Sequence, residues 1–396
     1  MRSDPAPGAW LRLTALAAAA ATLLAVVSGA LELGTAHRVL AALAVPPLVA
    51  LLVAAWVAHR RLLPFATAAL VLFGSAALVT SRGVHLALAA LAFSAALVLV
   101  AISHRGAPSP AGSVRDYITL TKPRIMSLLL ITGAGGMVVG AGGLPSPGIF
   151  AAAMAGLALA CGGASALNHL LDRDIDRLMG KRTDRRPVAA GRIPPPRALE
   201  FGLALSAFSF VLLAGTVNVL TAALALVGNL FYVLVYTRLL KRSTPQNIVI
   251  GGAAGAVPPL VGWADATGNL TLPALALFAI VFFWTPPHFW ALALLIRRDY
   301  ETARIPMLPV VRGTRETTRQ IVLYTLVLMA ASAAPFLLGT LGVLYLAAAL
   351  GLGAVLLWLA VLLRRQTTPR RAGVLFHYSL LYLALLFAAM AADAAV

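Results

Sequence analysis

The sequence predicts an all-α polytopic membrane protein, because composition, hydropathy and the placement of charge agree. Of its 396 residues, 61% are hydrophobic and 11% are charged, whereas soluble domains have about 45–50% apolar and about 25% charged residues. The mean hydropathy is +0.91. The net charge of +18 comes from cations in short clusters between long apolar runs, a pattern that orients a membrane protein. The composition therefore excludes a water-soluble fold and gives no support to nucleic-acid binding.

Thirteen apolar runs are long enough to cross a hydrocarbon core about 30 Å thick. They fall at roughly 10–30, 37–57, 63–80, 84–102, 123–143, 149–171, 197–215, 217–237, 246–263, 271–295, 320–339, 342–363 and 374–394. The first run lacks the small-residue cleavage site of a signal peptide, so a retained helix is expected.

The Lys and Arg residues predict how these spans are oriented. With a cytoplasmic N-terminus, all but two of the 31 Lys and Arg residues, Arg38 and Arg82, lie in cytoplasmic segments. Basic residues gather on the cytoplasmic side of membrane proteins, and thirteen spans place the C-terminus outside. We therefore expect a multi-pass protein of a bacterial-type inner membrane. The single cysteine, Cys161, excludes a disulfide framework and a cysteine metal cage.

A polar stretch rich in Pro, Gly and Ser, residues 103–113, separates four spans from nine. This composition is typical of a linker. The sequence thus predicts a four-helix transmembrane module over 1–104, a linker over 105–115 and a nine-span domain over 116–396.

The strongest sign of chemistry is Asn168-His-Leu-Leu-Asp172-Arg-Asp-Ile-Asp176, at the cytoplasmic end of the sixth span. Steps of four residues place Asn168, Asp172 and Asp176 in one stripe on a helix face, and Asp174 on the other side. Such oxygen ligands suit Mg²⁺, which proteins hold with one or two carboxylates and substrate phosphates. The alternative is a solvated helix end whose acids pair with Arg173, Arg177 and Arg182.

Cations follow this stripe and recur in two later segments. The sequence predicts diphosphate ligands in Lys181, Arg182, Arg186, Lys241, Arg242 and Arg298, since Arg forks and Lys point charges bind phosphate groups. The alternatives are a positive-inside anchor for the first cluster and a loop with a helix cap for the segment at Lys241.

A second polar region, Trp284-Thr-Pro-Pro-His-Phe-Trp290, lies inside the tenth span and is followed by Asp299. We expect the two prolines to break the helix there, which membranes tolerate where the freed carbonyls line a cavity or neighbouring helices rescue them. Asp299 ends the tenth span as Asp172 ends the sixth, so the two ends are interpreted as halves of one site. His288 is expected to face the cavity, or to be a buried hydrogen-bonding histidine.

These motifs closely resemble the protoheme IX farnesyltransferase (heme O synthase) family of UbiA-type intramembrane prenyltransferases. The match rests on Asn168-x3-Asp172-x3-Asp176, Arg182-Thr-x2-Arg186-Pro187, Tyr236-Thr through Thr-Pro-Gln-Asn247, Gly251-Gly252, Thr285-Pro-Pro-His-Phe-Trp290, Asp299-Tyr and Pro306-Met-Leu-Pro309, and it covers roughly Asp116 to the C-terminus. One departure is Ala303, which stands where many relatives carry a second acid after Asp299; Glu301 is the weaker substitute.

The resemblance implies a nine-helix bundle whose cavity is roofed by two cytoplasmic loops, and catalysis with Mg²⁺. It implies farnesyl diphosphate and heme b as substrates, Asn168, Asp172, Asp176 and Asp299 as catalytic metal ligands, and Trp284, His288 and Trp290 on the heme side.

The first four spans carry His37 and His85, in surroundings that resemble half of a heme A synthase. Two facing imidazoles can ligate heme iron, and heme A synthase is then an expected partner besides membrane lipid. The alternative is a scaffolding module whose histidines form hydrogen bonds at the membrane surface.

Two other functions stay open on the sequence alone. One is a prenyltransferase of the same fold that acts on a quinone precursor, against which the Thr285–Trp290 motif argues. The other is a transporter or a heme-binding subunit without catalysis. Transporters place charged sites at mid-membrane, whereas these acids lie at cytoplasmic helix ends.

Overall fold

The computed structural model describes residues 9–30, 35–58, 63–78, 92–93, 96, 112–180 and 183–395, which form helices and turns without a strand among them. The first helices are α1 (Ala9–Ala30), α2 (Thr35–Ala58) and α3 (Leu63–Leu78). The remainder contains α5 (Val114–Leu120), α6 (Pro123–Ala141), α7 (Pro147–Leu171), α8 (Arg173–Leu178), α9 (Pro195–Thr216), α10 (Val219–Leu230), the π-helix η2 (Phe231–Leu240), α11 (Asn247–Thr267), α12 (Leu272–Leu295), α13 (Arg297–Thr302), α14 (Leu308–Val311), α15 (Gly313–Leu337), α16 (Val343–Arg365) and α17 (Pro369–Ala394).

Within the described residues, nine helical segments are long and apolar enough to span a membrane: α6, α7, α9, α10 with η2, α11, α12, α15, α16 and α17. They correspond to the fifth to thirteenth predicted spans, so the all-helical membrane fold is confirmed. The expected fourth span, 84–102, falls outside the described residues except for 92, 93 and 96. The total of thirteen therefore stays a prediction.

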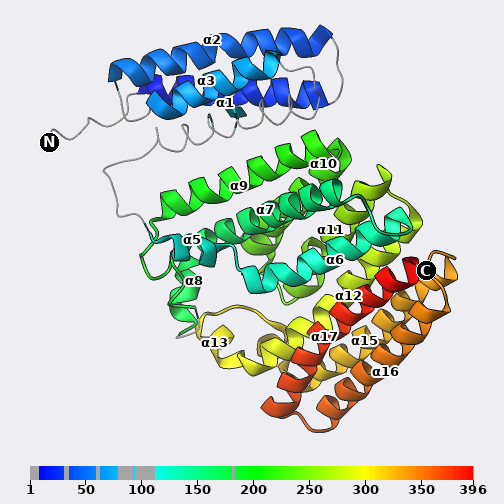
Figure 1. Cartoon of the computed structure of the whole chain (residues 1–396). Helices are drawn as coiled ribbons and strands as arrows, with labels where there is room; N and C mark the ends of the chain where they lie inside the picture. Colours follow the sequence, from blue (N-terminus) through cyan, green and yellow to red (C-terminus); the bar gives the residue numbers. More distant parts are fainter. Residues whose placement is uncertain are drawn as a thin grey trace.

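Helix α11 is the centre of the nine-helix bundle, packed between α6, α10 and α12 (Figure 1). Small residues allow the close crossing with α6. A Cβ added at Gly136 would lie 2.3 Å from the carbonyl oxygen of Pro259, and one added at Gly262 would lie 1.9 Å from that of Gly133. Glycines at such contacts let membrane helices approach closely where no hydrophobic force drives them together.

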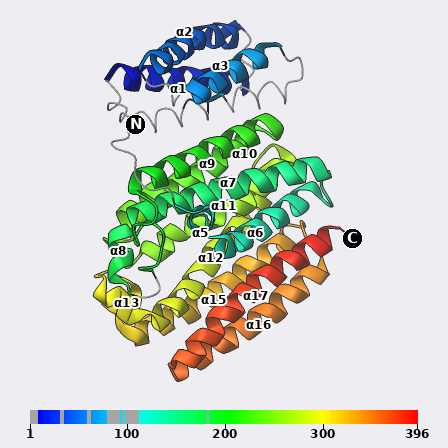
Figure 2. The ribbon, with the colours of Figure 1, turned by 60° about the vertical axis from the view of Figure 1, so that its left-hand side comes forward.

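The N-terminal helices form a separate layer over α9 and α10 (Figures 1 and 2). They share a core of their own, in which Leu48 and Leu51 of α2 are buried. A second, smaller cluster joins Ala19, Val26 and Ala76 to Val211 of α9. The division of the chain stays a prediction, as does its boundary at 105–115, most of which lies outside the described residues.

The expected helix break at Pro286-Pro287 is wrong, because α12 runs from Leu272 to Leu295 without interruption. A proline removes one N–H donor, but its fixed φ near −65° is compatible with a helix. Packing of α12 against α11, α15 and α17 encloses this part of the helix. The loop after α12 is also shorter than expected, since α15 begins at Gly313 rather than near residue 320.

Candidate active site

The short helices α8 and α13 lie together at one end of the bundle, opposite the C-terminus, in both views of the ribbon (Figures 1 and 2). Each directly follows a long helix: α8 follows α7 at Asp172, and α13 follows α12 at Ile296. The two predicted halves of the site are thus at the same end of the molecule.

The acid stripe is kept although α7 ends at Leu171 and α8 begins at Arg173. The backbone remains helical across the junction, because the amide of Asp172 donates to Asn168 (2.9 Å) and that of Asp176 donates to Asp172 (2.8 Å). Asn168, Asp172 and Asp176 are 3%, 0% and 1% exposed. Asp174 is exposed, as expected for the opposite face.

Each member of this stripe contacts a cationic side chain. Lys122 Nζ donates to Asn168 Oδ1 at 2.7 Å, Lys241 Nζ donates to Asp172 Oδ2, and Arg186 Nη1 donates to Asp176 Oδ1 at 2.7 Å. The acids therefore do not pair with Arg173 or Arg177, which donate instead to the backbone carbonyls of Leu170 and Ala189.

One oxygen of each buried acid has no hydrogen-bond partner among the described residues: Asp172 Oδ1 and Asp176 Oδ2. Burial raises the pKa of Asp176, and the Arg186 guanidinium opposes the rise. A buried acceptor without a partner costs about 1–3 kcal/mol or more when charged. The free oxygens are hard ligands beside the Asn168 amide, so these residues fit Mg²⁺.

The predicted diphosphate ligands separate into different environments. Arg186 and Lys241 contact the stripe, but Arg242 donates to both oxygens of Asp174 at 2.7 and 2.8 Å. This ion pair lowers the pKa of Asp174 to about 2. Arg242 thus binds on the exposed face, away from Asp172, and the structure does not bring it to the stripe. Lys181 and Arg182 lie outside the described residues.

Asp299 lies on α13, is partly exposed, and its carboxylate accepts no side-chain hydrogen bond or ion pair among the described residues. In the described part of the chain, no three His, Cys, Asp or Glu side chains lie close enough together to hold a metal ion. Asp299 is therefore not a third acid beside Asp172 and Asp176. Glu301 accepts from Arg297 at 2.7 Å, in an exposed pair, and Arg298 is exposed.

Tyr300 of α13 is a buried residue whose pKa is affected by charges in both halves of the site. Its side chain is 8% exposed. Burial raises its pKa to about 12; the negative charges of Asp172 and Asp299 add to the rise, and Arg186 opposes it.

The heme-side candidates divide into two groups. His288 stacks on Trp284 with ring centres 4.4 Å apart and on Phe376 at 4.7 Å, and its Nδ1 lies 2.7 Å from Ser379 Oγ. Both partners Phe376 and Ser379 belong to α17. Trp290 instead packs edge-on against Tyr324 of α15. His288 therefore joins α12 to α17 through a buried hydrogen bond and a ring stack, and its place on the heme side stays a prediction.

Sequence reasoning missed Lys122 and Thr237. Lys122 lies between α5 and α6, at the N-cap of α6. Its φ of 50° is in the left-handed region, which few residues other than glycine adopt. Desolvation, with Arg186 and Lys241 nearby, lowers its pKa to about 7. Thr237 accepts from Asn168 Nδ2 at 3.1 Å. The Lys-Pro dipeptide at the start of a span was the available signal for Lys122.

In the N-terminal module, His37 Nδ1 lies 3.1 Å from the carbonyl oxygen of Ala25. His85 lies outside the described residues. Heme ligation by this pair stays a prediction.

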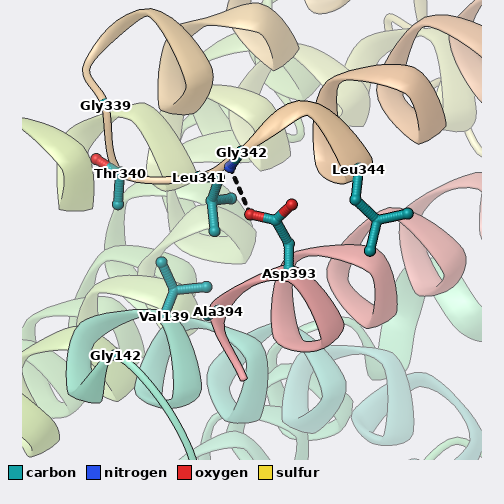
Figure 3. A pocket seen from close by; sticks show the side chains of 9 residues that line it. All are labelled: Val139, Gly142, Gly339, Thr340, Leu341, Gly342, Leu344, Asp393 and Ala394. Atoms are coloured by element: carbon teal, nitrogen blue, oxygen red, sulfur yellow. Dashed lines mark hydrogen bonds between the residues drawn. The ribbon is translucent and has the colours of Figure 1, made fainter. Parts of the chain in front are cut away.

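A pocket at the other end of the bundle is bordered by the ends of α6 and α17 and the turn before α16 (Figure 3). In it, the carboxylate of Asp393 accepts from the amides of Gly342 and Tyr345. These are first-turn donors of α16, so Asp393 caps that helix. The pocket has a structural explanation and lies far from the acid stripe.

Comparisons with known proteins agree with this arrangement. A relative named protoheme IX farnesyltransferase, from Symbiobacterium thermophilum, is 55% identical over 71% of this chain and 94% of its own length. One from Roseiflexus sp. (strain RS-1), with the same name, is 44% identical over 92% of this chain and 76% of its own length. Those of Thermus thermophilus are longer, and the chain spans 48% of their length at 53% identity.

Solved structures share the fold at low identity. A digeranylgeranylglyceryl phosphate synthase matches with a TM-score of 0.59 at 17% identity, over 71% of this chain and 98% of that one. A UbiA homolog from Archaeoglobus fulgidus bound to GPP and Mg²⁺ matches with a TM-score of 0.53 at 18% identity, over 69% of this chain and 99% of that one. The family model described as the UbiA prenyltransferase family matches residues 129–387. The chain is an integral membrane protein that belongs to the UbiA prenyltransferase family.

Proposed function

We propose that the chain transfers the farnesyl group of farnesyl diphosphate to a vinyl group of heme b and so makes heme O. The observation that carries the proposal is the buried acid stripe, where two carboxylates keep one free oxygen each beside three cations. The name shared by relatives 44–55% identical to this chain supports farnesyl and heme as the reacting groups.

Asn168, Asp172 and Asp176 would hold Mg²⁺, and Asp299 would supply a further carboxylate ligand from α13. When bound, the ion supplies positive charge that stabilises the diphosphate as a leaving group. Lys122, Arg186 and Lys241 lie on the stripe and would neutralise the same diphosphate oxygens as negative charge grows on them.

The proposed reaction has two stages, ionisation of farnesyl diphosphate and addition of the vinyl group to the farnesyl cation. The bond between farnesyl C1 and the diphosphate oxygen breaks, and the diphosphate leaves with the electron pair. The vinyl π electrons of heme b form the new bond to C1. Water adds to the resulting cation and loses a proton, which gives a hydroxyethylfarnesyl side chain. Trp284 and His288 are buried, and on the heme side they would exclude other water from the cation.

We further propose that the N-terminus is cytoplasmic, in a bacterial-type inner membrane, and that residues 116–396 form the catalytic domain. The stripe then faces the cytoplasm, where soluble or membrane-bound diphosphates are available. The cations grouped at the same helix ends support this orientation.

The test is to incubate the purified full-length protein with heme b, farnesyl diphosphate and Mg²⁺, and to weigh the heme product by mass spectrometry. We expect a farnesylated, hydrated heme that disappears with EDTA and returns with added Mg²⁺. An unchanged heme, with a quinone precursor prenylated instead, would show that the acceptor is wrong while the fold and the diphosphate chemistry are right.

A further inference from the structure

Three basic side chains bind oxygens of the acid stripe, beside the two acid oxygens that have no partner among the described residues. Lys122, Lys241 and Arg186 come from different segments of the chain, yet each donates to one member of the stripe. Two carboxylates and three basic side chains are thus in contact before any ligand binds.

At Asn168, Lys122 and a metal ion would compete for the same oxygen atom. Its Nδ2 donates to Asp172 Oδ2 at 2.8 Å and to Thr237 Oγ1 at 3.1 Å. Only Oδ1 can bind a metal, and Lys122 already donates to that atom. A lysine ammonium has donors alone, so the atom facing it must be the amide oxygen. Metal coordination by Asn168 therefore places a divalent cation and Lys122 on the same oxygen, and their repulsion favours displacement of Lys122.

Neither the metal ion alone nor the diphosphate alone would offset the cost of moving these basic side chains away from the stripe. A divalent cation alone would add two positive charges beside three basic side chains that already bind the stripe. A diphosphate alone would draw the cations away and leave two buried carboxylates without partners, which is costly. The metal and the diphosphate together satisfy both sets of groups, because the acids bind the metal while the cations bind the phosphate oxygens.

We propose that Lys122, Lys241 and Arg186 are placeholders for the metal, and that they move to the diphosphate only when both ligands arrive. Metal and diphosphate then bind cooperatively, and Lys122 is a ligand-binding residue that couples them. This inference rests on the proposed diphosphate chemistry but not on the identity of the acceptor. It extends the function by predicting an order: free metal binds poorly until a prenyl diphosphate is present.

The test uses Mn²⁺ as the probe, followed by EPR on the full-length protein in detergent, with and without farnesyl thiodiphosphate. We expect the diphosphate analogue to tighten Mn²⁺ binding at least about tenfold. In Lys122→Met, Mn²⁺ alone should bind several-fold more tightly than in the wild type, while the analogue should bind more weakly. A variant that merely damaged the site would lose affinity for both.

Arg173→Met is the matched control, since Arg173 is an exposed cation beside Asp172 that donates only to the carbonyl of Leu170 in the described residues. It should leave both affinities unchanged. Equal Mn²⁺ affinity with and without the analogue would overturn the proposal, as would an unchanged metal-alone affinity in Lys122→Met. Neither readout requires heme, so a failure of heme farnesylation would be seen separately.

Discussion

Asp172 and Asp174 are two positions apart but have opposite surroundings. Asp172 is fully buried and keeps one free oxygen, whereas the side chain of Asp174 is 60% exposed and both its oxygens bind Arg242. Asp172→Asn or Asp176→Asn should therefore lower heme O formation by about 100-fold or more, by analogy with the loss of one stabilising group at a transition state. Product formation by mass spectrometry at saturating substrates measures this.

Asp174→Asn is the control for these variants. It removes an exposed ion pair of the kind that contributes about 0–1 kcal/mol, so turnover should stay near that of the wild type. Wild-type turnover in both Asp172→Asn and Asp176→Asn would contradict the metal assignment.

Because Ala303 replaces the second acid of the α13 half, either Asp299 or Glu301 must be the metal ligand there. Glu301 is held by Arg297 in an exposed pair, whereas the carboxylate of Asp299 has no such ion pair among the described residues. We expect Asp299→Asn to lower turnover about 10-fold or more and Glu301→Gln to change it little. Steady-state rates at varied Mg²⁺ distinguish them, because loss of a metal contact raises the Mg²⁺ requirement. A larger loss in Glu301→Gln would exchange their roles.

Residue spacing predicted the stripe but not its partners. Four-residue steps place Asn168, Asp172 and Asp176 on one face whatever surrounds the helix. Lys122 and Lys241 are separated from their partners by 46 and 69 residues. Such contacts depend on how α6 and η2 pack against α7, which no local pattern encodes. The same limit explains why Arg242 was expected at the diphosphate.

At the scale of elements, apolar runs predicted the helices of the nine-span bundle, since a span must satisfy its own backbone in lipid. They did not predict η2, in which Thr237 Oγ1 bonds the carbonyl of Tyr232 and the amide of Lys241 bonds that of Tyr236, five residues back. A π-helix widens the turn and is frequent at functional sites. Here it precedes Lys241 and carries Thr237, so the altered register positions both toward α7.

The contact between α12 and α17 gives a prediction at the same scale. His288 lies between Trp284 and Phe376, and Ser379 engages its Nδ1. His288→Phe keeps an aromatic ring in the stack but removes both nitrogens. We expect a melting temperature near that of the wild type and weaker heme b binding, with farnesyl diphosphate affinity unchanged. Heme titration and diphosphate binding on the same sample measure this.

Ser379→Ala is the companion variant, because it removes the hydrogen bond to His288 and the local bond from Ser379 Oγ to the carbonyl of Phe376 but keeps the imidazole. It should weaken heme binding less than His288→Phe does. Equal losses of heme and diphosphate affinity in His288→Phe would show that the histidine serves only to join the two helices.

For the whole molecule, the question is whether the N-terminal helices belong to the enzyme. Helix α5, at the start of the proposed catalytic domain, has its own N-terminal cap. Ser113 and Asp116 form a capping box, and Asp116 pairs with Arg192 at 2.8 Å. Removing the module would uncover Val211 and its neighbours on α9, which are apolar. Lipid solvates such a face without the cost that water would impose, so the domain should remain folded.

A variant beginning at Gly112 should therefore insert in the same orientation and farnesylate heme b at a maximal rate near that of the full chain. Four predicted spans are an even number, so their removal leaves the new N-terminus cytoplasmic. If the module delivers heme through His37 and His85, the truncated protein would keep its maximal rate but require more heme to reach it. A bis-histidine heme spectrum of the full chain, lost in His37→Ala, would accompany that result. A truncated protein that is folded and inserted but inactive at any heme concentration would show that the two layers form one catalytic unit, because the acid stripe itself lies entirely beyond the cut.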